Sequence, residues 1–206
     1  MKCVVLGHTK GLGQTLYNHF KKSGSEVIGL SRSNGYDAET NLAGIIEAAT
    51  GADLFINCSY CAGHQAELVL ALKDKVKKIV ACGSISRTEP FVDFIDPVYV
   101  ANKKALADAC RLVSISTEPY ADVLHIDITF LEGQKVFDPK DPSNFSSDHQ
   151  IKFSEIIAAV EFWLTCPNVR EIEFRWKLTP LLIGSLKRIK KDSELLNDLT
   201  AKVQGL

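Results

Sequence analysis

Short apolar runs alternate along the chain with segments in which apolar residues recur every three or four positions. The short runs predict strands, and the longer period predicts amphipathic helices that bury one face. Strands that alternate with helices are typical of a parallel sheet with right-handed crossovers and helices on both faces. The pattern therefore predicts an α/β fold with a doubly wound, mostly parallel sheet in three layers.

The elements can be placed from this pattern. Strands are expected at residues 3–6, 26–31, 53–57, 78–82, 122–130 and 170–175, and helices at 11–22, 42–49, 65–72, 98–113 and 154–164. The long loop 132–149 is rich in Asp, Pro and Ser, and we expect it to form a lid over a substrate. Basic and apolar residues mix in segment 181–206, which predicts a helical tail packed on a single domain spanning 1–206, with a membrane-surface helix as the alternative.

Composition narrows the class of protein. The chain has 206 residues, of which 46% are hydrophobic and 24% charged, with a net charge of -1. A nearly neutral chain is a poor ligand for nucleic acid, whose phosphates favour basic surfaces. No apolar run reaches bilayer length, and no signal-peptide cleavage pattern follows the N-terminus. We therefore expect a cytoplasmic protein whose partners include neither nucleic acid nor membrane.

Six cysteines lie scattered through apolar segments. In a reducing compartment we expect them to be small buried hydrophobic residues. Cys58 and Cys61 form a C-x-x-C motif, which leaves a redox role open as an alternative. A structural zinc site would need a second pair of ligands at suitable spacing. No such pair follows, so we predict no metal site.

A glycine-rich turn joins the first strand to the first helix and reads Gly7-His8-Thr9-Lys10-Gly11-Leu12-Gly13. Glycines at such a turn allow tight backbone geometry and close approach to a pyrophosphate. The unpaired N–H groups and the dipole of the helix N-terminus then bind the negative charge. All seven residues are therefore predicted to bind a dinucleotide, with the His8 ring stacked near it.

The end of the second predicted strand indicates which dinucleotide is bound. NAD-specific sites usually place Asp or Glu there, on the ribose 2′-hydroxyl. This chain has Ser31-Arg32-Ser33 instead, so no carboxylate repels a 2′-phosphate and Arg32 offers a planar fork to bind one. Lys10 adds a second positive charge. The residues favour NADP(H) as cofactor, and NAD(H) stays open.

A Y-x-x-x-K motif places Tyr99 and Lys103 one turn apart on a predicted helix. A nearby ammonium favours the phenolate and brings its pKa toward the range that general acid–base catalysis needs. Ser84, which follows the strand 78–82, can donate a hydrogen bond to a substrate oxygen, with Ser86 as the alternative. A second match, Tyr17 to Lys21, lies in the first helix behind the glycine turn, and we treat it as coincidental.

Together, the glycine turn, Ser84 and the Tyr99-x-x-x-Lys103 motif resemble the short-chain dehydrogenase/reductase family, over roughly the first three quarters of the chain. The resemblance implies a Rossmann fold and catalytic roles: Tyr99 as proton donor or acceptor, Lys103 on the nicotinamide ribose, Ser84 on the substrate carbonyl. It also implies cofactor contacts from Asn57-Cys58-Ser59, which stand where the family has Asn-Asn-Ala-Gly, and from Asp37 at the adenine.

These features predict an NADP(H)-dependent oxidoreductase that moves a hydride between nicotinamide and a small carbonyl or alcohol substrate, with Tyr99 as general acid/base. The helix 65–72 lacks the family's relay Asn, and no Pro-Gly follows the strand 122–130. Those departures motivate an alternative, a non-catalytic NADP(H)-binding sensor or interaction protein. A nucleotide-sugar epimerase or dehydratase is a further alternative. The resemblance also suggests a homodimer or homotetramer built from helices 98–113 and 154–164.

Overall fold

The computed structural model describes residues 1–88, 96–128, 131, 150–166 and 169–174. These belong to one compact unit, Met1–Arg175, and a second unit comprises Trp176–Leu206. The predicted lid 132–149 and the predicted tail 181–206 both lie outside the described residues. Lid, tail and a single domain spanning the whole chain therefore stay predictions.

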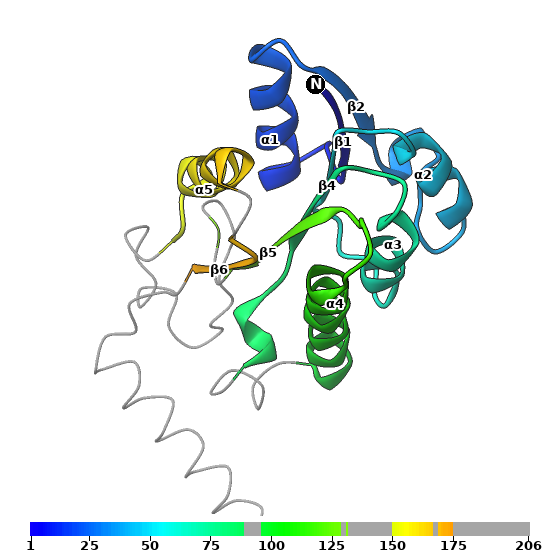
Figure 1. The fold of residues 1–206 in the computed structure, drawn as a ribbon, viewed down its shortest axis with the longest axis vertical. Coiled ribbons are helices and arrows are strands. Elements are labelled where there is room, and N and C mark those ends of the chain that lie inside the picture. Colours follow the sequence, from blue (N-terminus) through cyan, green and yellow to red (C-terminus); the bar gives the residue numbers. More distant parts are fainter. Residues whose placement is uncertain (89–95, 129–130, 132–149, 167–168, 175–206) are drawn as a thin grey trace, which may run out of the picture. The chain divides into compact units, whose positions relative to one another are not determined.

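The sheet of the first unit has six strands in the order β2-β1-β3-β4-β5-β6, and each neighbouring pair is parallel (Figure 1). Its strands are β1 (Lys2–Leu6), β2 (Glu26–Leu30), β3 (Leu54–Asn57), β4 (Lys78–Cys82), β5 (Asp122–Ile128) and β6 (Glu171–Phe174). The order reverses between β1 and β3, which opens a crevice at the carboxyl ends of the strands, the usual ligand site of such sheets. The predicted doubly wound Rossmann-type sheet is confirmed.

Helices cover both faces of the sheet, as predicted. They are α1 (Gly11–Lys22), α2 (Leu42–Ala49), α3 (His64–Leu72), α4 (Pro97–Ile115) and α5 (Phe153–Thr165), with short 3₁₀ turns η1 (Arg32–Asn34) and η2 (Ile85–Arg87). Figure 1 shows α1 and α5 on one side and α2, α3 and α4 on the other. Two buried apolar clusters correspond to these two faces. None of the described helices is long and apolar enough to cross a membrane.

Side chains alternate between the two clusters along each strand, as the pleat requires. In β1, Val4 and Leu6 face α2 and α3, whereas Cys3 and Val5 face α1 and α5. Because helices cover both faces, β3 is buried along its whole length. This explains why the strands read as continuous apolar runs rather than as alternating ones.

One crossover connection between neighbouring strands differs in handedness from the others. The chain moves in the same direction across the sheet from β3 to β4, to β5 and to β6. The helices α3 and α4 lie on one face, but α5 packs with α1 on the other. The connection from β5 to β6 therefore has the opposite hand to its neighbours, so the expectation of right-handed crossovers throughout was wrong.

Most predicted boundaries lie within two residues of the observed ones, and the differences have local causes. The helix expected from residue 98 begins at Pro97 because the Asp96 carboxylate caps it by accepting from the Val98 N–H at 3.0 Å. Proline at the first helical position needs no hydrogen-bond acceptor. Ser31, expected to end a strand, instead caps η1. Val98, Leu112 and Ile115 of α4 are exposed, and self-association through this helix stays a prediction.

Candidate functional site

A cavity of about 1050 Å³ lies at the carboxyl ends of the strands, where the strand order reverses. It contains all three predicted catalytic residues and every predicted cofactor-binding residue except His8, Asp37 and Asn57. Its lining residues are Gly7, Thr9, Lys10, Gly11, Leu12, Gly13, Ser31, Arg32, Ser33, Cys58, Ser59, Tyr60, Cys82, Gly83, Ser84, Tyr99, Lys103, Ile128, Leu131 and Phe153. The tertiary structure thus brings together residues as distant in the sequence as Gly7 and Phe153, which are 146 positions apart.

The turn between β1 and α1 needs glycine at specific positions. Gly7 and Gly11 have φ angles of +88° and +57°, in the left-handed region that side chains disfavour. A Cβ on Gly13 would lie 2.2 Å from the Gly7 carbonyl oxygen, so only glycine lets the helix pack this closely on the turn. These two constraints hold the backbone open toward the cavity.

The N-terminus of α1 suits an anionic ligand. The N-cap residue, Lys10, makes no side-chain cap among the described residues, and the first turn carries no acidic residue. The first N–H groups of a helix have no partner within the helix. Gly11, Leu12 and Gly13 of this first turn line the cavity. The positive end of the helix dipole lies at the same turn. This donor set, with a backbone that a Cβ would obstruct, fits the pyrophosphate of a dinucleotide.

Arg32 lines the same cavity. Asn34 completes a capping box with Ser31, and Ser31 Oγ lies 2.8 Å from Ser33 Oγ. These contacts fix the turn that carries Arg32, whose side chain is exposed. Within the described part of the chain, the Arg32 guanidinium has no carboxylate partner. A positive charge held in this way remains available for an anionic ligand.

Three residues expected at the cofactor lie outside the cavity lining. The His8 ring packs on Tyr17, with ring centroids 5.2 Å apart, and fills the space beside Gly29. Asp37 uses its Oδ1 to accept from the Glu39 N–H in a local turn. Asn57 ends β3 with its side chain wholly buried, and neither amide atom has a hydrogen-bond partner among the described residues.

The predicted catalytic helix α4 places Lys103 at the bottom of the cavity. Its ammonium donates to the Gln65 Oε1 at 2.7 Å and to the Cys82 carbonyl oxygen at 3.2 Å. It also lies 5.6 Å from the centroid of the Tyr99 ring and 5.4 Å from that of Tyr60. Burial lowers the pKa of Lys103, although nearby thiols and Asp127 oppose the effect. The ammonium therefore lies near the Tyr99 ring in a poorly solvated site, where charges interact strongly.

Ser84 and Ser86 share one turn of η2, and the structure distinguishes them. Their hydroxyls form a hydrogen bond, and Ser84 Oγ also accepts from the Ser86 N–H at 3.3 Å. Ser84 lines the cavity, whereas Ser86 is buried beside it. The geometry therefore favours Ser84 as the hydroxyl that meets a ligand, with Ser86 orienting it.

Sequence reasoning missed Gln65 and Tyr60. Gln65 shares one helical face with Leu68, Val69 and Leu72, all buried, so a polar residue on an apolar face was the available signal. Tyr60 follows the predicted Asn57-Cys58-Ser59 segment, and its ring lies 5.0 Å from that of Tyr99. No local pattern in the sequence indicates this second phenol, because it depends on how α4 packs.

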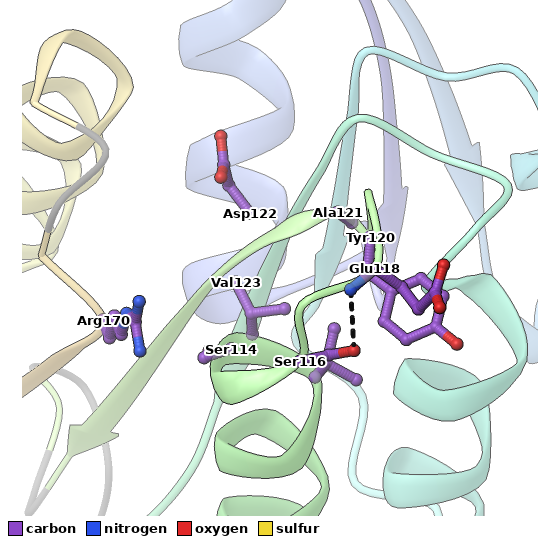
Figure 2. A pocket seen from close by; sticks show the side chains of 9 residues that line it. Ser114, Ser116, Glu118, Tyr120, Ala121, Asp122, Val123 and Arg170 are labelled. Atoms are coloured by element: carbon purple, nitrogen blue, oxygen red, sulfur yellow. Dashed lines mark hydrogen bonds between the residues drawn. The ribbon is translucent and has the colours of Figure 1, made fainter.

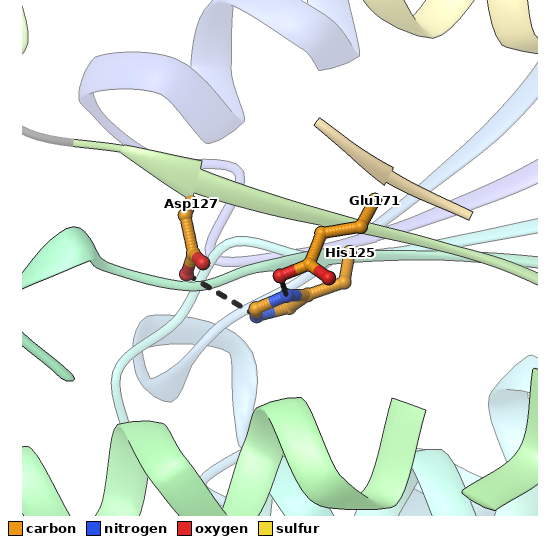
Figure 3. Close-up of side chains that lie close together, drawn as sticks. All are labelled: His125, Asp127 and Glu171. Carbon is orange, nitrogen blue, oxygen red and sulfur yellow. Dashed lines mark ion pairs between the residues drawn. The ribbon is translucent and has the colours of Figure 1, made fainter. Parts of the chain in front are cut away.

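Behind the cavity, a buried charge network anchors η2. Arg87 donates through Nε to Asp127 Oδ2 at 2.8 Å and through Nη2 to Asp127 and Glu171. Figure 3 shows His125 paired with Asp127 through Nε2 and with Glu171 through Nδ1. A Cβ on Gly83 would lie 2.3 Å from His125 Nε2, so the network packs directly under the residue before Ser84.

The ionisation of this network follows from its burial. Burial lowers the pKa of His125, and Arg87 adds to this effect while Asp127 opposes it. His125, Asp127 and Glu171 are residue types that bind metals, and their ligand atoms lie within 4.8 Å of one another. The Arg87 guanidinium already supplies a positive charge to both carboxylates. The arrangement is thus that of an ion-pair network that fixes η2 to β5 and β6.

A second cavity, of about 540 Å³, lies at the opposite edge of the sheet, where β5 begins (Figure 2). Its lining includes Ser116, Glu118 and Tyr120 from the segment before β5, together with Arg170. Glu118 N–H donates to Ser116 Oγ at 3.2 Å, which closes a local turn. This cavity contains none of the predicted site residues.

Comparisons with known proteins agree with this description of the fold. No protein-family model matches the sequence, and no curated protein matches it. The structure of protein lin1944 from Listeria innocua is similar with a TM-score of 0.69 and 15% identity, covering 85% of this chain and 100% of that chain. The structure of UDP-N-acetylglucosamine 4-epimerase from Bacillus cereus is similar with a TM-score of 0.62 and 18% identity, covering 84% of this chain and 77% of that chain. The structure of dTDP-4-dehydrorhamnose reductase from Bacillus anthracis, in complex with NADP, has a TM-score of 0.60 and 10% identity, covering 84% of this chain and 74% of that chain. At these identities the likeness establishes a shared fold.

Proposed function

We propose that this protein is an NADP(H)-dependent oxidoreductase, resembling short-chain dehydrogenases/reductases, that interconverts a small carbonyl compound and its alcohol. The observation that carries the proposal is a single cavity lined both by the glycine turn and by Ser84, Tyr99 and Lys103. The residues proposed for phosphate binding and for proton transfer therefore line one cavity.

Residues of this chain would hold the cofactor at two of its phosphate groups. The N–H groups at the start of α1 would bind the pyrophosphate, and Arg32 would pair with a 2′-phosphate. The bound nicotinamide would supply or accept the hydride. The preference for NADP(H) rests on the exposed Arg32 beside Ser31 and Ser33 rather than on any neighbour, since the NADP-bound reductase is only 10% identical.

Tyr99 would handle the proton. In the reductive direction its phenol donates a proton to the substrate oxygen as the carbonyl becomes an alcohol, and in the oxidative direction the phenolate takes it back. The Lys103 ammonium, 5.6 Å from the Tyr99 ring centroid, stabilises the phenolate. The Ser84 hydroxyl donates a hydrogen bond to the same substrate oxygen.

The remaining wall of the cavity indicates the substrate class. Ile128, Leu131 and Phe153 contribute apolar side chains, and Tyr60 adds an aromatic ring beside Tyr99. This surface favours a small carbonyl compound with an apolar or aromatic flank, because such a flank is transferred out of water on binding. A charged substrate would gain less from these contacts.

Replacement of Tyr99 by Phe tests the proposal. The variant should bind NADPH with nearly unchanged affinity and lose carbonyl-dependent NADPH oxidation by about 10²- to 10⁴-fold, since general acid catalysis contributes that much. Tyr17→Phe is the matched control, because Tyr17 begins the second Y-x-x-x-K and packs on His8 outside the cavity.

Each outcome distinguishes the proposal from its alternatives. Retained activity in Tyr99→Phe would exclude Tyr99 as the proton donor. NADPH binding without consumption across a broad panel of aldehydes and ketones would select the non-catalytic sensor instead. A dinucleotide that stays bound through purification, with no net oxidation of added alcohols, would favour an epimerase or dehydratase.

A further inference from the structure

Two cysteines that are distant in sequence lie side by side in the wall of the cavity. Cys58 Sγ and Cys82 Sγ are 3.5 Å apart. Asn57 of β3 pairs with Ala81 of β4, so Cys58 and Cys82 occupy the next position along two neighbouring parallel strands. The C-x-x-C partner suggested by the sequence, Cys61, instead directs its thiol to the Ser59 carbonyl oxygen. The close pair is therefore created by strand register rather than by the motif.

The surroundings activate one thiol of the pair. The hydrogen bond between the two thiols lowers the pKa of Cys82, and the Lys103 ammonium lowers it further against the effect of burial. The same hydrogen bond and burial raise the pKa of Cys58. Lys103 is held in place by its contact with the Cys82 carbonyl oxygen at 3.2 Å. Cys82 is thus the thiol of the pair that loses its proton more readily, and Cys58 the one that holds its proton more tightly.

Both residues line the cavity, with Cys58 partly buried and Cys82 buried. We propose that Cys58 and Cys82 form a redox-active thiol pair, which a hydroperoxide converts to a disulfide in the wall of the dinucleotide cavity. The pair needs no bound dinucleotide, and the proposal therefore goes beyond the proposed function and can stand without it.

The reaction balances with hydrogen peroxide as the oxidant. The Cys82 thiolate attacks one peroxide oxygen, the O–O bond breaks, and the leaving hydroxide takes a proton, which gives a sulfenic acid and water. Cys58 sulfur then attacks Cys82 sulfur, the S–O bond breaks, and the Cys58 proton leaves with the hydroxide as a second water. The two sulfurs are oxidised and the peroxide is reduced. A disulfide needs its sulfurs about 2.05 Å apart, so the thiols must approach by about 1.5 Å.

The other described cysteines are poorly placed for this chemistry. Burial raises the pKa of Cys3 to about 12 and that of Cys61 to about 11, so both stay protonated thiols. Burial likewise raises the pKa of Cys110. Cys166 is exposed at the C-cap of α5 and is not among the residues that line the cavity. Reactivity follows the thiolate form, which selects Cys82.

The test begins with the full-length protein free of nucleotide. One equivalent of hydrogen peroxide should remove two hydrogen atoms from the intact mass, and proteolysis without reductant should yield a peptide pair linked through Cys58 and Cys82. Dithiothreitol should restore the original mass. A linkage between Cys58 and Cys61, or oxygen addition to Cys82 without any disulfide, would overturn the proposal.

Variants and a second probe make the result independent of any one measurement. Cys61→Ser and Cys166→Ser should form the linked peptide at the wild-type rate, whereas Cys58→Ser and Cys82→Ser should not form it. Phenylarsine oxide, which bridges two neighbouring thiols with loss of one water, should bind the wild-type protein once and mask two thiols. Failure of wild-type protein to bind it would count against the pair even if the variants misfold.

A final arm separates this inference from the proposed function. If NADPH occupies the cavity, it should slow the peroxide reaction by about 100-fold at a concentration 100 times its Kd, because only the free protein reacts. Binding by calorimetry without any such protection would overturn the placement of the thiols in the dinucleotide cavity. Disulfide formation without any NADPH binding would remove the proposed function and leave the thiol pair established.

Discussion

Gln65 Oε1 accepts a hydrogen bond from the buried Lys103 ammonium across 2.7 Å, although the two residues lie on different helices. Lys103 is only 4% exposed, and its pKa is lowered chiefly by burial. Gln65 therefore holds the ammonium near the Tyr99 ring, and it stabilises the charged form of Lys103.

Removing that acceptor should lower the pKa of Lys103 further. In Gln65→Leu, the alkaline limb of the pH profile of kcat should move to lower pH, because Lys103 loses its proton sooner. Because the buried ammonium loses one of its two acceptors, the free energy of unfolding should also fall by about 1–3 kcal/mol, measured with urea. Gln65→Glu, which adds a negative charge, should move the limb the other way. An unchanged profile in both variants would contradict the positioning role.

Arg32 should decide between the two dinucleotides. Arg32→Glu should weaken NADPH binding by about 10- to 100-fold, since a charge-assisted hydrogen bond contributes about 1.5–3 kcal/mol, while NADH affinity changes little. Calorimetry with both cofactors measures this difference. Arg32→Gln removes the charge without adding repulsion and should give an intermediate loss. Equal losses for NADPH and NADH would refute the assignment of the 2′-phosphate site.

Gly13 should tolerate no side chain. In Gly13→Ala the added Cβ meets the Gly7 carbonyl oxygen at 2.2 Å, so α1 must move away from the turn. The expected result is loss of NADPH binding and about 1–3 kcal/mol lower unfolding free energy, as for overpacked cores. Gly63→Ala is the control, because the nearest atom to its Cβ would be Asn102 Oδ1 at 3.8 Å. If both variants behave alike, the close approach at Gly13 does not matter.

Replacing only one member of the Arg87–Asp127 pair should strongly lower the free energy of unfolding. Asp127 is wholly buried, so Arg87→Met should lower the unfolding free energy by about 3–5 kcal/mol by leaving a buried carboxylate unpaired. Arg87→Met combined with Asp127→Leu should cost less than the two single changes added together. A double-mutant cycle by urea denaturation measures the coupling. The exposed Lys78–Asp122 pair is the control, expected to contribute at most about 1 kcal/mol.

His125 should make stability depend on pH below neutrality. Its folded pKa lies below the ordinary value of 6.5, mainly because of burial. Between the two values the unfolded chain binds more protons, so the unfolding free energy should fall as pH drops from about 6.5 through the folded pKa. In His125→Gln this decline should be flatter over the same window. A steeper decline in the variant would show that protonation of His125 stabilises the fold.

The sequence located most elements because their signals are local. The helices at 11–22 and 42–49 and the strand at 78–82 have their predicted bounds, since hydrophobic period and glycine or asparagine at the ends depend on neighbouring residues alone. The glycine turn and the Tyr99–Lys103 spacing belong to the same kind of information. Both were predicted to line one site, and both line the same cavity.

What the sequence by itself determined is therefore the succession of strands and helices, the glycine turn and the one-turn spacing of phenol and ammonium. Only the tertiary structure decided that Lys103 bonds to Gln65, that Cys58 lies beside Cys82 rather than Cys61, and that α5 packs with α1. These contacts depend on strand order and register, which are set when both faces of the sheet are buried at once. Burial of that kind is a property of the whole packed chain, and no local pattern of residues encodes it.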